Sequence, residues 1–273
     1  MPETQVSRRN APPAVNRYGD MCAEVYVLDK PPGALGDIGY YTEALRRAGG
    51  PVLEAACGSG RLLIPLLEAG IDVRGFDRSE SMLHQCRLAC DQRGLTPDLR
   101  RTSFEEFAYD ERFAAIVVAV GTFTLIDDFA AALAALRRFH AHLRPGGRLY
   151  VDLMPLAYLT ATPADFVRSW TTPEGDILRI DSRRIELDLL TQRRVCQDHY
   201  QRWRDGRLVE QELEVLATRL WGLQEFELTL REAGFGDIGV CGGYQPGRAP
   251  HPGDRWWCFE ASRPAQNPVR RAG

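Results

Sequence analysis

The chain has 273 residues, of which 44% are hydrophobic, and a formal net charge of −3. This length predicts one large domain, or one domain with an insertion, built around a substantial core. Arginines are spread among acidic residues rather than clustered, which argues against nucleic-acid binding because phosphate neutralisation requires a concentrated basic surface. The longest apolar stretches are too short to span a bilayer, so we expect no membrane partner.

The seven cysteines are an odd number without any C-x-x-C pair, a pattern typical of reduced thiols. The chain also opens without the charged, apolar and small-residue segments of a secretory leader. Both observations favour a cytoplasmic protein. No carboxylate or histidine cluster has the spacing of metal ligands, so we expect no metal site.

The first three segments run from a polar tail to an alternating core. Residues 1–16 are polar and contain prolines, which predicts a disordered tail. Residues 17–50 are expected to form a helical cap of two helices, separated by a break at Pro31-Pro32-Gly33. Residues 51–154 alternate between strand-like and helix-like patterns, which predicts a parallel sheet with right-handed crossovers.

The last three segments change to an antiparallel pattern. Residues 155–222 are expected to form a β-rich lid insert, because strand-like alternation runs through 177–216 with a hairpin turn at 204–207. Residues 223–263 predict a helix followed by two closing strands that complete the core. Residues 264–273 are expected to be a second disordered tail.

Residues 52–61, with the sequence VLEAACGSGR, carry the main functional signal. They read as a buried strand, a tight glycine turn and a helix whose free N–H groups face a ligand. Glycine suits Gly58 and Gly60 because a Cβ blocks close approach of a ligand to the backbone. A second strand then ends at Asp77, about twenty residues past the turn, where a carboxylate can accept hydrogen bonds from ribose hydroxyls. The sequence therefore predicts a nucleoside site.

Two common nucleotide motifs fit this segment poorly. The dinucleotide fingerprint G-x-G-x-x-G requires a third glycine where Leu63 stands. A phosphate-binding P-loop requires a lysine after its second glycine, whereas the single lysine of the chain is Lys30.

An acid followed by this small-residue turn resembles motif I of the class I S-adenosylmethionine-dependent methyltransferases. In that family the acid lies near the ammonium group of the methionine part, and the turn lies against the amino-acid end of the cofactor. The resemblance assigns four residues to S-adenosyl-L-methionine: Glu54, Ala56, Gly58 and Gly60.

The resemblance continues through roughly residues 40–155. Asp77 matches the ribose-binding acid, and Arg78 and Met82 open the next helix, where an apolar residue commonly covers the adenine. Ser103 and Phe104 occupy a third motif, in which the family often has Asp where Ser103 stands.

Two later segments extend the match. Val120 ends a strand over 113–120, although the family usually has Phe-Asp where Phe113-Ala114 stands. A Leu-Arg-Pro-Gly-Gly turn at 143–147 is similar to the family's entry into its fifth strand. The resemblance implies an α/β, Rossmann-like class I methyltransferase fold: a mostly parallel seven-stranded sheet with an antiparallel C-terminal hairpin and the β-rich lid.

The acceptor side offers few candidates. His199, in the insert, is a candidate general base, and Tyr18 and Tyr26 are candidates to line the acceptor or to close over the cofactor. Tyr41, on a helix leading into the glycine turn, is a candidate partner of the methionine carboxylate.

The resemblance, including the run 37–41, implies a bacterial small-molecule methyltransferase that acts by in-line transfer to a nitrogen or oxygen acceptor, with S-adenosyl-L-homocysteine as product. Two alternatives stay open: a catalytically silent S-adenosylmethionine-binding scaffold or regulatory protein, and a nicotinamide-dependent oxidoreductase. The sequence does not decide between a monomer and a homodimer.

Overall fold

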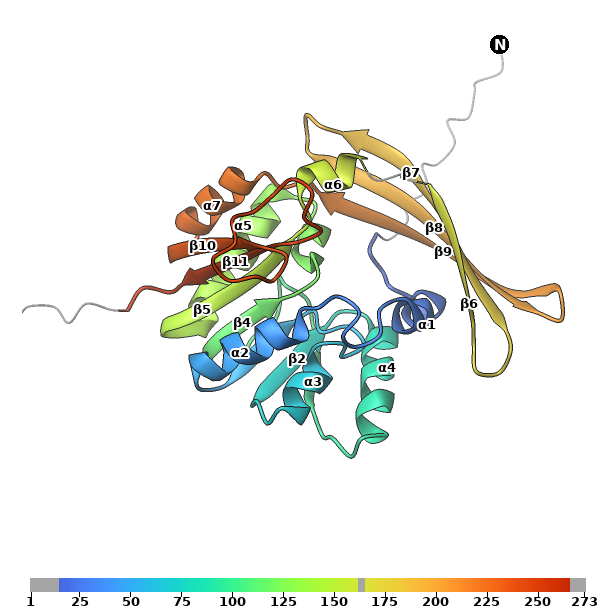
Figure 1. The fold of residues 1–273 in the computed structure, drawn as a ribbon, viewed down its shortest axis with the longest axis horizontal. Helices are drawn as coiled ribbons and strands as arrows, with labels where there is room; N and C mark the ends of the chain where they lie inside the picture. The colour runs from blue at the N-terminus through green and yellow to red at the C-terminus, as the bar shows by residue number, and fades with distance from the viewer. Residues whose placement is uncertain (1–14, 162–164, 266–273) are drawn as a thin grey trace, which may run out of the picture.

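The computed structural model describes residues 15–161 and 165–265 and contains two β-sheets (Figure 1). The larger sheet has seven strands in the order β10-β11-β5-β4-β1-β2-β3. Its strands are β1 (Val52–Ala55), β2 (Val73–Asp77), β3 (Asp98–Arg101), β4 (Phe113–Val118), β5 (Leu143–Leu153), β10 (Gly236–Gly242) and β11 (Trp257–Ser262). Strands β1 to β5 are parallel, whereas β11 is antiparallel to both β5 and β10. This confirms the predicted mostly parallel sheet with an antiparallel closing hairpin.

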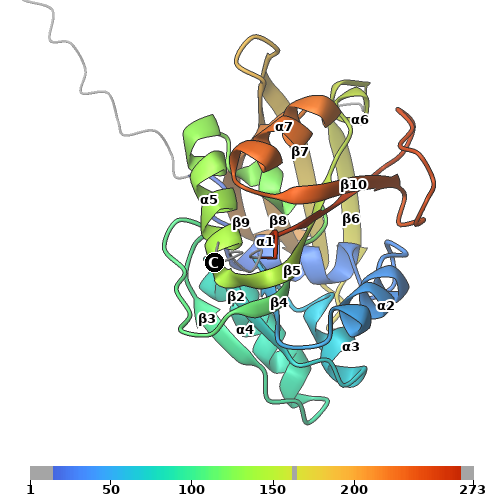
Figure 2. The same ribbon diagram turned by 90° about the vertical axis from the view of Figure 1, so that its left-hand side faces the viewer.

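Helices cover both faces of this sheet (Figure 2). One face packs against α2 (Ile38–Ala48), α3 (Leu63–Glu68) and α4 (Glu80–Asp91), and the other against α5 (Phe129–His142) and α7 (Leu223–Glu232). The central strand β4 is buried at every residue, as expected for a parallel strand that is covered on both faces. Among the described residues, no helix has the length and apolar content needed to cross a membrane.

The second sheet is antiparallel and has the order β6-β7-β8-β9. Its strands are β6 (Phe166–Thr171), β7 (Ile177–Asp188), β8 (Arg193–Arg204) and β9 (Arg207–Arg219). Asp205 and Gly206 have φ of 48° and 73°, so the predicted hairpin turn has the primed geometry that suits twisted strands. The predicted β-rich insert is therefore present.

Helix α1 (Asp20–Asp29) lies between the second sheet and the core (Figure 1). Its apolar side packs on Leu178, Ile180 and Tyr200 of the second sheet. The same helix contacts α4 of the core. Two short helices, η1 (Thr122–Leu125) and α6 (Leu156–Ala161), complete the described elements. The function of the second sheet as a lid stays a prediction.

The predicted tails fall mostly outside the described residues. Residues 1–14 and 266–273 are not described, but Val15 and Asn16 are, and they correct the predicted boundary. Asn16 is 4% exposed, and its side chain bonds the backbone of Leu125 and Ala217 at 2.8–2.9 Å. The polar sequence does not predict this burial of Asn16. An amide side chain is buried without penalty when hydrogen bonds satisfy its donors and its acceptor.

Candidate active site

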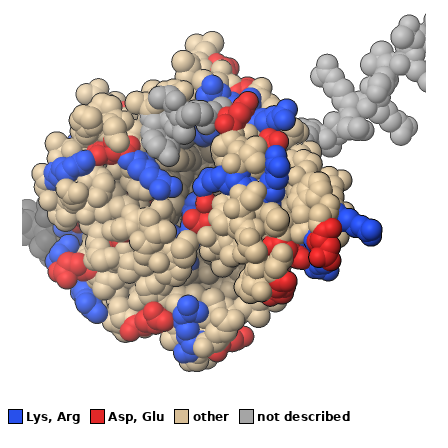
Figure 3. Space-filling view, turned by 45° about the vertical axis from the view of Figure 1, so that its right-hand side comes forward, with Lys and Arg blue, Asp and Glu red and all other residues tan. Residues whose placement is uncertain are grey.

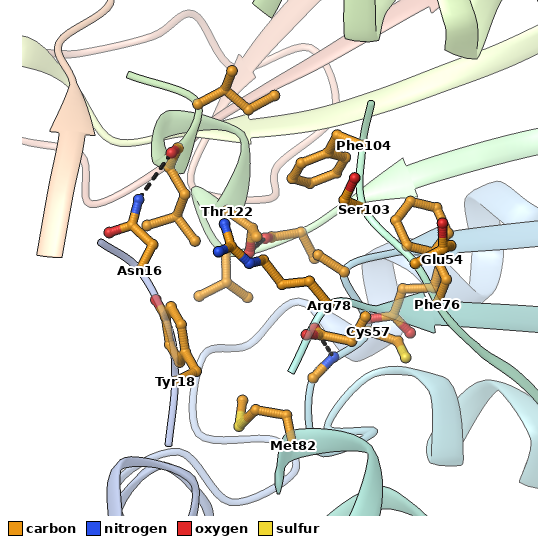
Figure 4. A pocket seen from close by; sticks show the side chains of 18 of the residues that line it. Asn16, Tyr18, Glu54, Cys57, Phe76, Arg78, Met82, Ser103, Phe104 and Thr122 are labelled. Atoms are coloured by element: carbon orange, nitrogen blue, oxygen red, sulfur yellow. Dashed lines mark hydrogen bonds between the residues drawn. The ribbon is translucent and has the colours of Figure 1, made fainter. Parts of the chain in front are cut away.

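A cavity lies at the carboxyl ends of β1 to β4, the edge where parallel α/β sheets bind ligands. It contains about 890 Å³ of space between protein atoms, part of it open to solvent. Figure 4 shows side chains from separate loops around this space, with Arg78 extending into it. Eleven of the predicted site residues line this cavity: Tyr18, Tyr26, Glu54, Ala56, Gly58, Asp77, Arg78, Met82, Ser103, Phe104 and Val120. We call it the first cavity.

The loop after β1 is held against β2 by hydrogen bonds that its backbone amides donate. The Cys57 amide donates to the Phe76 carbonyl and the Gly58 amide to Asp77 Oδ2, both at 2.9 Å. Gly58 has a φ of +56°, in the left-handed region that glycine adopts without strain. A Cβ on Gly58 would lie 2.9 Å from the Met82 methyl group, so a side chain there would crowd the cavity wall.

Asp77 ends β2 and is 8% exposed. Its Oδ2 accepts from the Gly58 amide, and its Oδ1 accepts from the Ser79 amide at 2.8 Å. Burial raises the pKa of Asp77, and these backbone bonds oppose that rise. Since each carboxylate oxygen can accept two hydrogen bonds, Asp77 keeps acceptor capacity toward the cavity.

Glu54, on β1, is 4% exposed, and within residues 15–161 and 165–265 its Oε2 has no hydrogen-bond partner. Burial raises the pKa of Glu54 to about 8, against the opposing charge of Arg61. An unpartnered buried carboxylate is costly, so this position favours a ligand group that is positive and donates hydrogen bonds.

Arg61 lines the cavity and was missed by the sequence reading. Its guanidinium makes two hydrogen bonds to Asp37, at 2.8 and 2.6 Å, and both side chains are buried. The charge of Arg61 lies close enough to lower the pKa of the Tyr26 hydroxyl, which burial raises to about 12. Nothing in the sequence pairs two residues 24 positions apart, so only the fold shows this ion pair.

Tyr41 was predicted as a partner of the methionine carboxylate, but the structure does not place it at a cavity wall. It lines neither the first cavity nor a second cavity that adjoins it. It is fully buried, and its hydroxyl donates to Asp152 Oδ1 at 2.6 Å. Asp152 Oδ2 also accepts from the Tyr244 hydroxyl and the Val120 amide, both at 2.8 Å. Val120 has a φ of +58°, so Tyr41 acts through Asp152 on a left-handed backbone position in the cavity wall.

Gly60 is also absent from the lining of the first cavity. It has a φ of +81°, and a Cβ there would lie 2.6 Å from Cys86 Sγ. Gly60 therefore allows the start of α3 to pack against α4. Glycine is needed here for helix packing and not, as predicted, for close approach of a ligand.

His199 is the third corrected position. Successive side chains of a strand point to opposite faces, so on β8 the neighbours Asp198 and Tyr200 line a cavity while His199 does not. His199 instead contacts Gln211 Oε1 on β9 through Nε2, at 3.0 Å. His199, predicted as a candidate general base, therefore lines neither cavity.

A second cavity adjoins the first. It contains about 1160 Å³ of space, part of it open to solvent, between α1, the second sheet and the end of β4. Asn16, Tyr18, Tyr26, Val120, Thr122 and Leu125 line both cavities. The space-filling view shows a hollow with acidic and basic side chains at its edge (Figure 3). Within the described residues, no group of three or more His, Cys, Asp or Glu side chains has the arrangement of a metal site.

Residues 52–147 match the model of a methyltransferase domain family. The chain is 30% identical over 164 residues to a cypemycin N-terminal methyltransferase of Streptomyces sp, a match that covers 58% of this chain and 64% of that protein. It is 28% identical over 127 residues to a ubiquinone biosynthesis O-methyltransferase of Marinobacter nauticus, covering 45% of this chain and 53% of that one. The chain thus spans between about half and two thirds of the length of these relatives.

Solved structures share the fold. An S-adenosylmethionine-dependent methyltransferase from Clostridium acetobutylicum superposes with a TM-score of 0.73 at 15% identity, covering 89% of this chain and 98% of that one. The CcbJ methyltransferase from Streptomyces caelestis gives 0.71 at 22% identity, covering 91% and 98%. A glycopeptide N-methyltransferase, MtfA, in complex with S-adenosyl-L-homocysteine gives 0.54 at 22% identity, covering 83% and 86%.

Residues 52–147 are therefore similar to a methyltransferase domain, and the chain shares the fold of S-adenosylmethionine-dependent methyltransferases.

Proposed function

We propose that the protein binds S-adenosyl-L-methionine in the first cavity and transfers its methyl group to a nitrogen or oxygen atom of a small molecule in the second. The unpartnered Oε2 of Glu54 carries this proposal, because it needs a cationic donor that no described residue supplies. The relatives named above include an N-terminal methyltransferase and an O-methyltransferase, which supports the reaction class and leaves the acceptor atom open.

The residues around the first cavity fit this cofactor. Glu54 would accept a hydrogen bond from the ammonium group, and Asp77 from the ribose hydroxyls. Met82 and Phe104 offer apolar surfaces for the adenine ring, with Ser103 as a polar contact beside it. Gly58 leaves room that a Cβ would fill.

When bound, the cofactor supplies a methyl group on a positively charged sulfur, which is an excellent leaving group. The remaining task of the chain is to orient the acceptor in line and to exclude water. Tyr18 and Tyr26 line both cavities, so their rings border the path between cofactor and acceptor. Their pKa values are raised by burial, so both hydroxyls stay protonated near neutral pH and can donate hydrogen bonds.

A calorimetric titration with S-adenosyl-L-methionine, S-adenosyl-L-homocysteine and NADH tests this proposal. We expect binding of both sulfur nucleosides at about one site per chain and no binding of NADH. Gly58→Ala should weaken nucleoside binding by about ten-fold or more, because its Cβ would crowd the cavity wall.

Gly70→Ala is the matched control. Gly70 also has a positive φ, of +73°, but a Cβ there meets no atom within 4 Å. Both variants therefore carry the backbone strain, and only Gly58→Ala changes the cavity. Binding of NADH in place of the sulfur nucleosides would establish the oxidoreductase alternative. Tight nucleoside binding without methylation of any acceptor would favour the silent scaffold.

A further inference from the structure

Asp198 is the neighbour of His199 on β8. Asp198 is on the opposite face of β8 and lines the second cavity with Tyr200. It is 7% exposed, and its Oδ1 accepts a hydrogen bond from the Ser182 hydroxyl of β7. Within the described ranges, no side chain or backbone donor bonds its Oδ2. One oxygen of a nearly buried carboxylate is thus left for a ligand.

Two other carboxylates line the second cavity, and both already have cation partners. Asp29 pairs with Arg168 at 2.7 Å and with Lys30 at 3.1 Å. Glu214 pairs with Arg17 at 3.1 Å and also accepts from the Gly19 amide. Among the described residues, Asp198 has no such ion pair.

The polar and charged groups around Asp198 only partly offset the cost of burying its carboxylate. Burial raises its pKa, and the bond from Ser182 and the charge of Arg194 offset this only in part. The charge of Glu214 raises the pKa further, while Lys30 lowers it. Because buried charges are normally paired, the arrangement favours a cation that arrives with the ligand.

The rest of the wall suits an organic cation. Phe166, Trp170, Tyr200 and Trp256 line the same cavity, and aromatic rings attract alkylammonium groups through their π faces. Tyr18 connects this region to the first cavity. Desolvation is the main cause of its raised pKa, and the nearby charges of Asp77 and Asp198 both raise it further. Tyr18 thus lies within electrostatic reach of both carboxylates.

We infer that the acceptor is an amine and that Asp198 is the residue that binds it, a role that rests on the proposed methyl transfer. The Asp198 carboxylate pairs with the ammonium form and takes up the proton that the nitrogen must lose. The nitrogen lone pair then forms the bond to the methyl carbon, and the carbon–sulfur bond breaks with its electron pair remaining on sulfur. A hydroxyl acceptor would leave the charge of Asp198 uncompensated.

Binding measurements on the S-adenosyl-L-homocysteine complex test this inference. The probes are benzylamine and cyclohexylamine, each compared with its hydroxyl analogue, benzyl alcohol or cyclohexanol. We expect the amines to bind about ten-fold tighter or more than the alcohols, and Asp198→Asn to abolish that preference. His199→Ala changes the adjacent residue on the opposite face of the strand and should keep it.

Asp198 does not line the first cavity, so Asp198→Asn should bind S-adenosyl-L-homocysteine like the unmodified protein, which also verifies its folding. Asp198→Ser serves as the second variant should Asn prevent folding. Equal binding of amines and alcohols, no amine binding up to millimolar concentration, or a preference that survives in Asp198→Asn would overturn the inference. The amine titrations are repeated without the nucleoside, so a failure of cofactor binding is distinguished from a failure of amine recognition.

Discussion

Burial changes the pKa of the Glu54 carboxylate, which its sequence motif alone does not indicate. The motif indicates an acid next to the cofactor, whereas the structure leaves Oε2 without a partner among the described residues and raises the pKa to about 8. In the absence of ligand, Glu54 is therefore protonated over much of the range in which an ordinary glutamate is ionised.

This raised pKa predicts how stability depends on pH. Between the unfolded value of 4.5 and the folded value of about 8, the folded protein binds the extra proton, so its free energy of unfolding falls as the pH rises. The slope contributed by Glu54 is roughly 1.4 kcal/mol per pH unit within this window. Urea unfolding of Glu54→Gln from about pH 5 to about pH 8 should show that this fall is removed.

Glu232→Gln is the control, because that carboxylate is on the surface with 64% of its side chain exposed. It should follow the pH profile of the unmodified protein. Parallel profiles for all three proteins would contradict the raised pKa of Glu54.

Individual residues were predictable to different degrees. Glu54, Gly58 and Asp77 could be found because the strand–turn–helix–strand order fixes where their backbones lie. Arg61 and Asn16 gave no signal, because their partners are distant in the chain and are reached by side chains from loops or helix ends. Tyr41 was found and misassigned, since the sequence could not show that Asp152 takes its hydroxyl.

At the scale of elements, strand alternation decided which side chains of β8 line the second cavity. The sequence predicted β8 as a strand, but the side that faces the cavity depends on how the second sheet packs on α1. If the opposite face of β8 lay toward the second cavity, His199 would line it in place of Asp198 and Tyr200.

The network on Asp152 joins α2, β5, the loop after β10 and the end of β4. Burial raises the pKa of Asp152 to about 6, and the bond from Tyr41 opposes that rise. Asp152 is therefore ionised near neutral pH and accepts charge-assisted bonds, which are stronger than bonds between neutral groups.

Tyr41→Phe should lower the free energy of unfolding by about 1.5–3 kcal/mol, since it removes a hydrogen bond to a buried charged group. Tyr109→Phe is a matched control, because the Tyr109 hydroxyl is buried without a partner among the described residues. Removing that hydroxyl should cost less than about 0.5 kcal/mol or increase stability. Denaturant unfolding of both variants measures this difference, and equal losses would show that the network contributes nothing specific.

At the scale of the whole molecule, Asn16 connects the second sheet to the core. Its amide nitrogen donates to the carbonyls of Leu125, in η1, and Ala217, in β9, and its Oδ1 accepts from the Ala217 amide. Asn16 has a φ of 55°, a conformation that asparagine tolerates better than most residues. The two cavities adjoin each other at this residue.

Asn16→Ala should lower the free energy of unfolding by about 2 kcal/mol or more, because three backbone groups, two of them in buried hydrogen bonds, lose their partner. Hydrogen exchange at the Ala217 amide should accelerate at the same time. Gln211→Ala removes an exposed amide from the same strand and should change stability by less than about 0.5 kcal/mol. Unchanged exchange at Ala217 in Asn16→Ala would contradict the connecting role.

The sequence by itself determined the order of strands and helices, the glycine loop and the acid that ends β2. These features depend on local periodicity and on backbone requirements at single positions, and both are set by residues that are neighbours in the sequence. Only the tertiary structure decided that Tyr41 supports Asp152, that Arg61 pairs with Asp37 and that Asp198 rather than His199 lines the second cavity. Such contacts join residues far apart in the chain, and burial, which sets their charge and partners, is a property of the packed molecule.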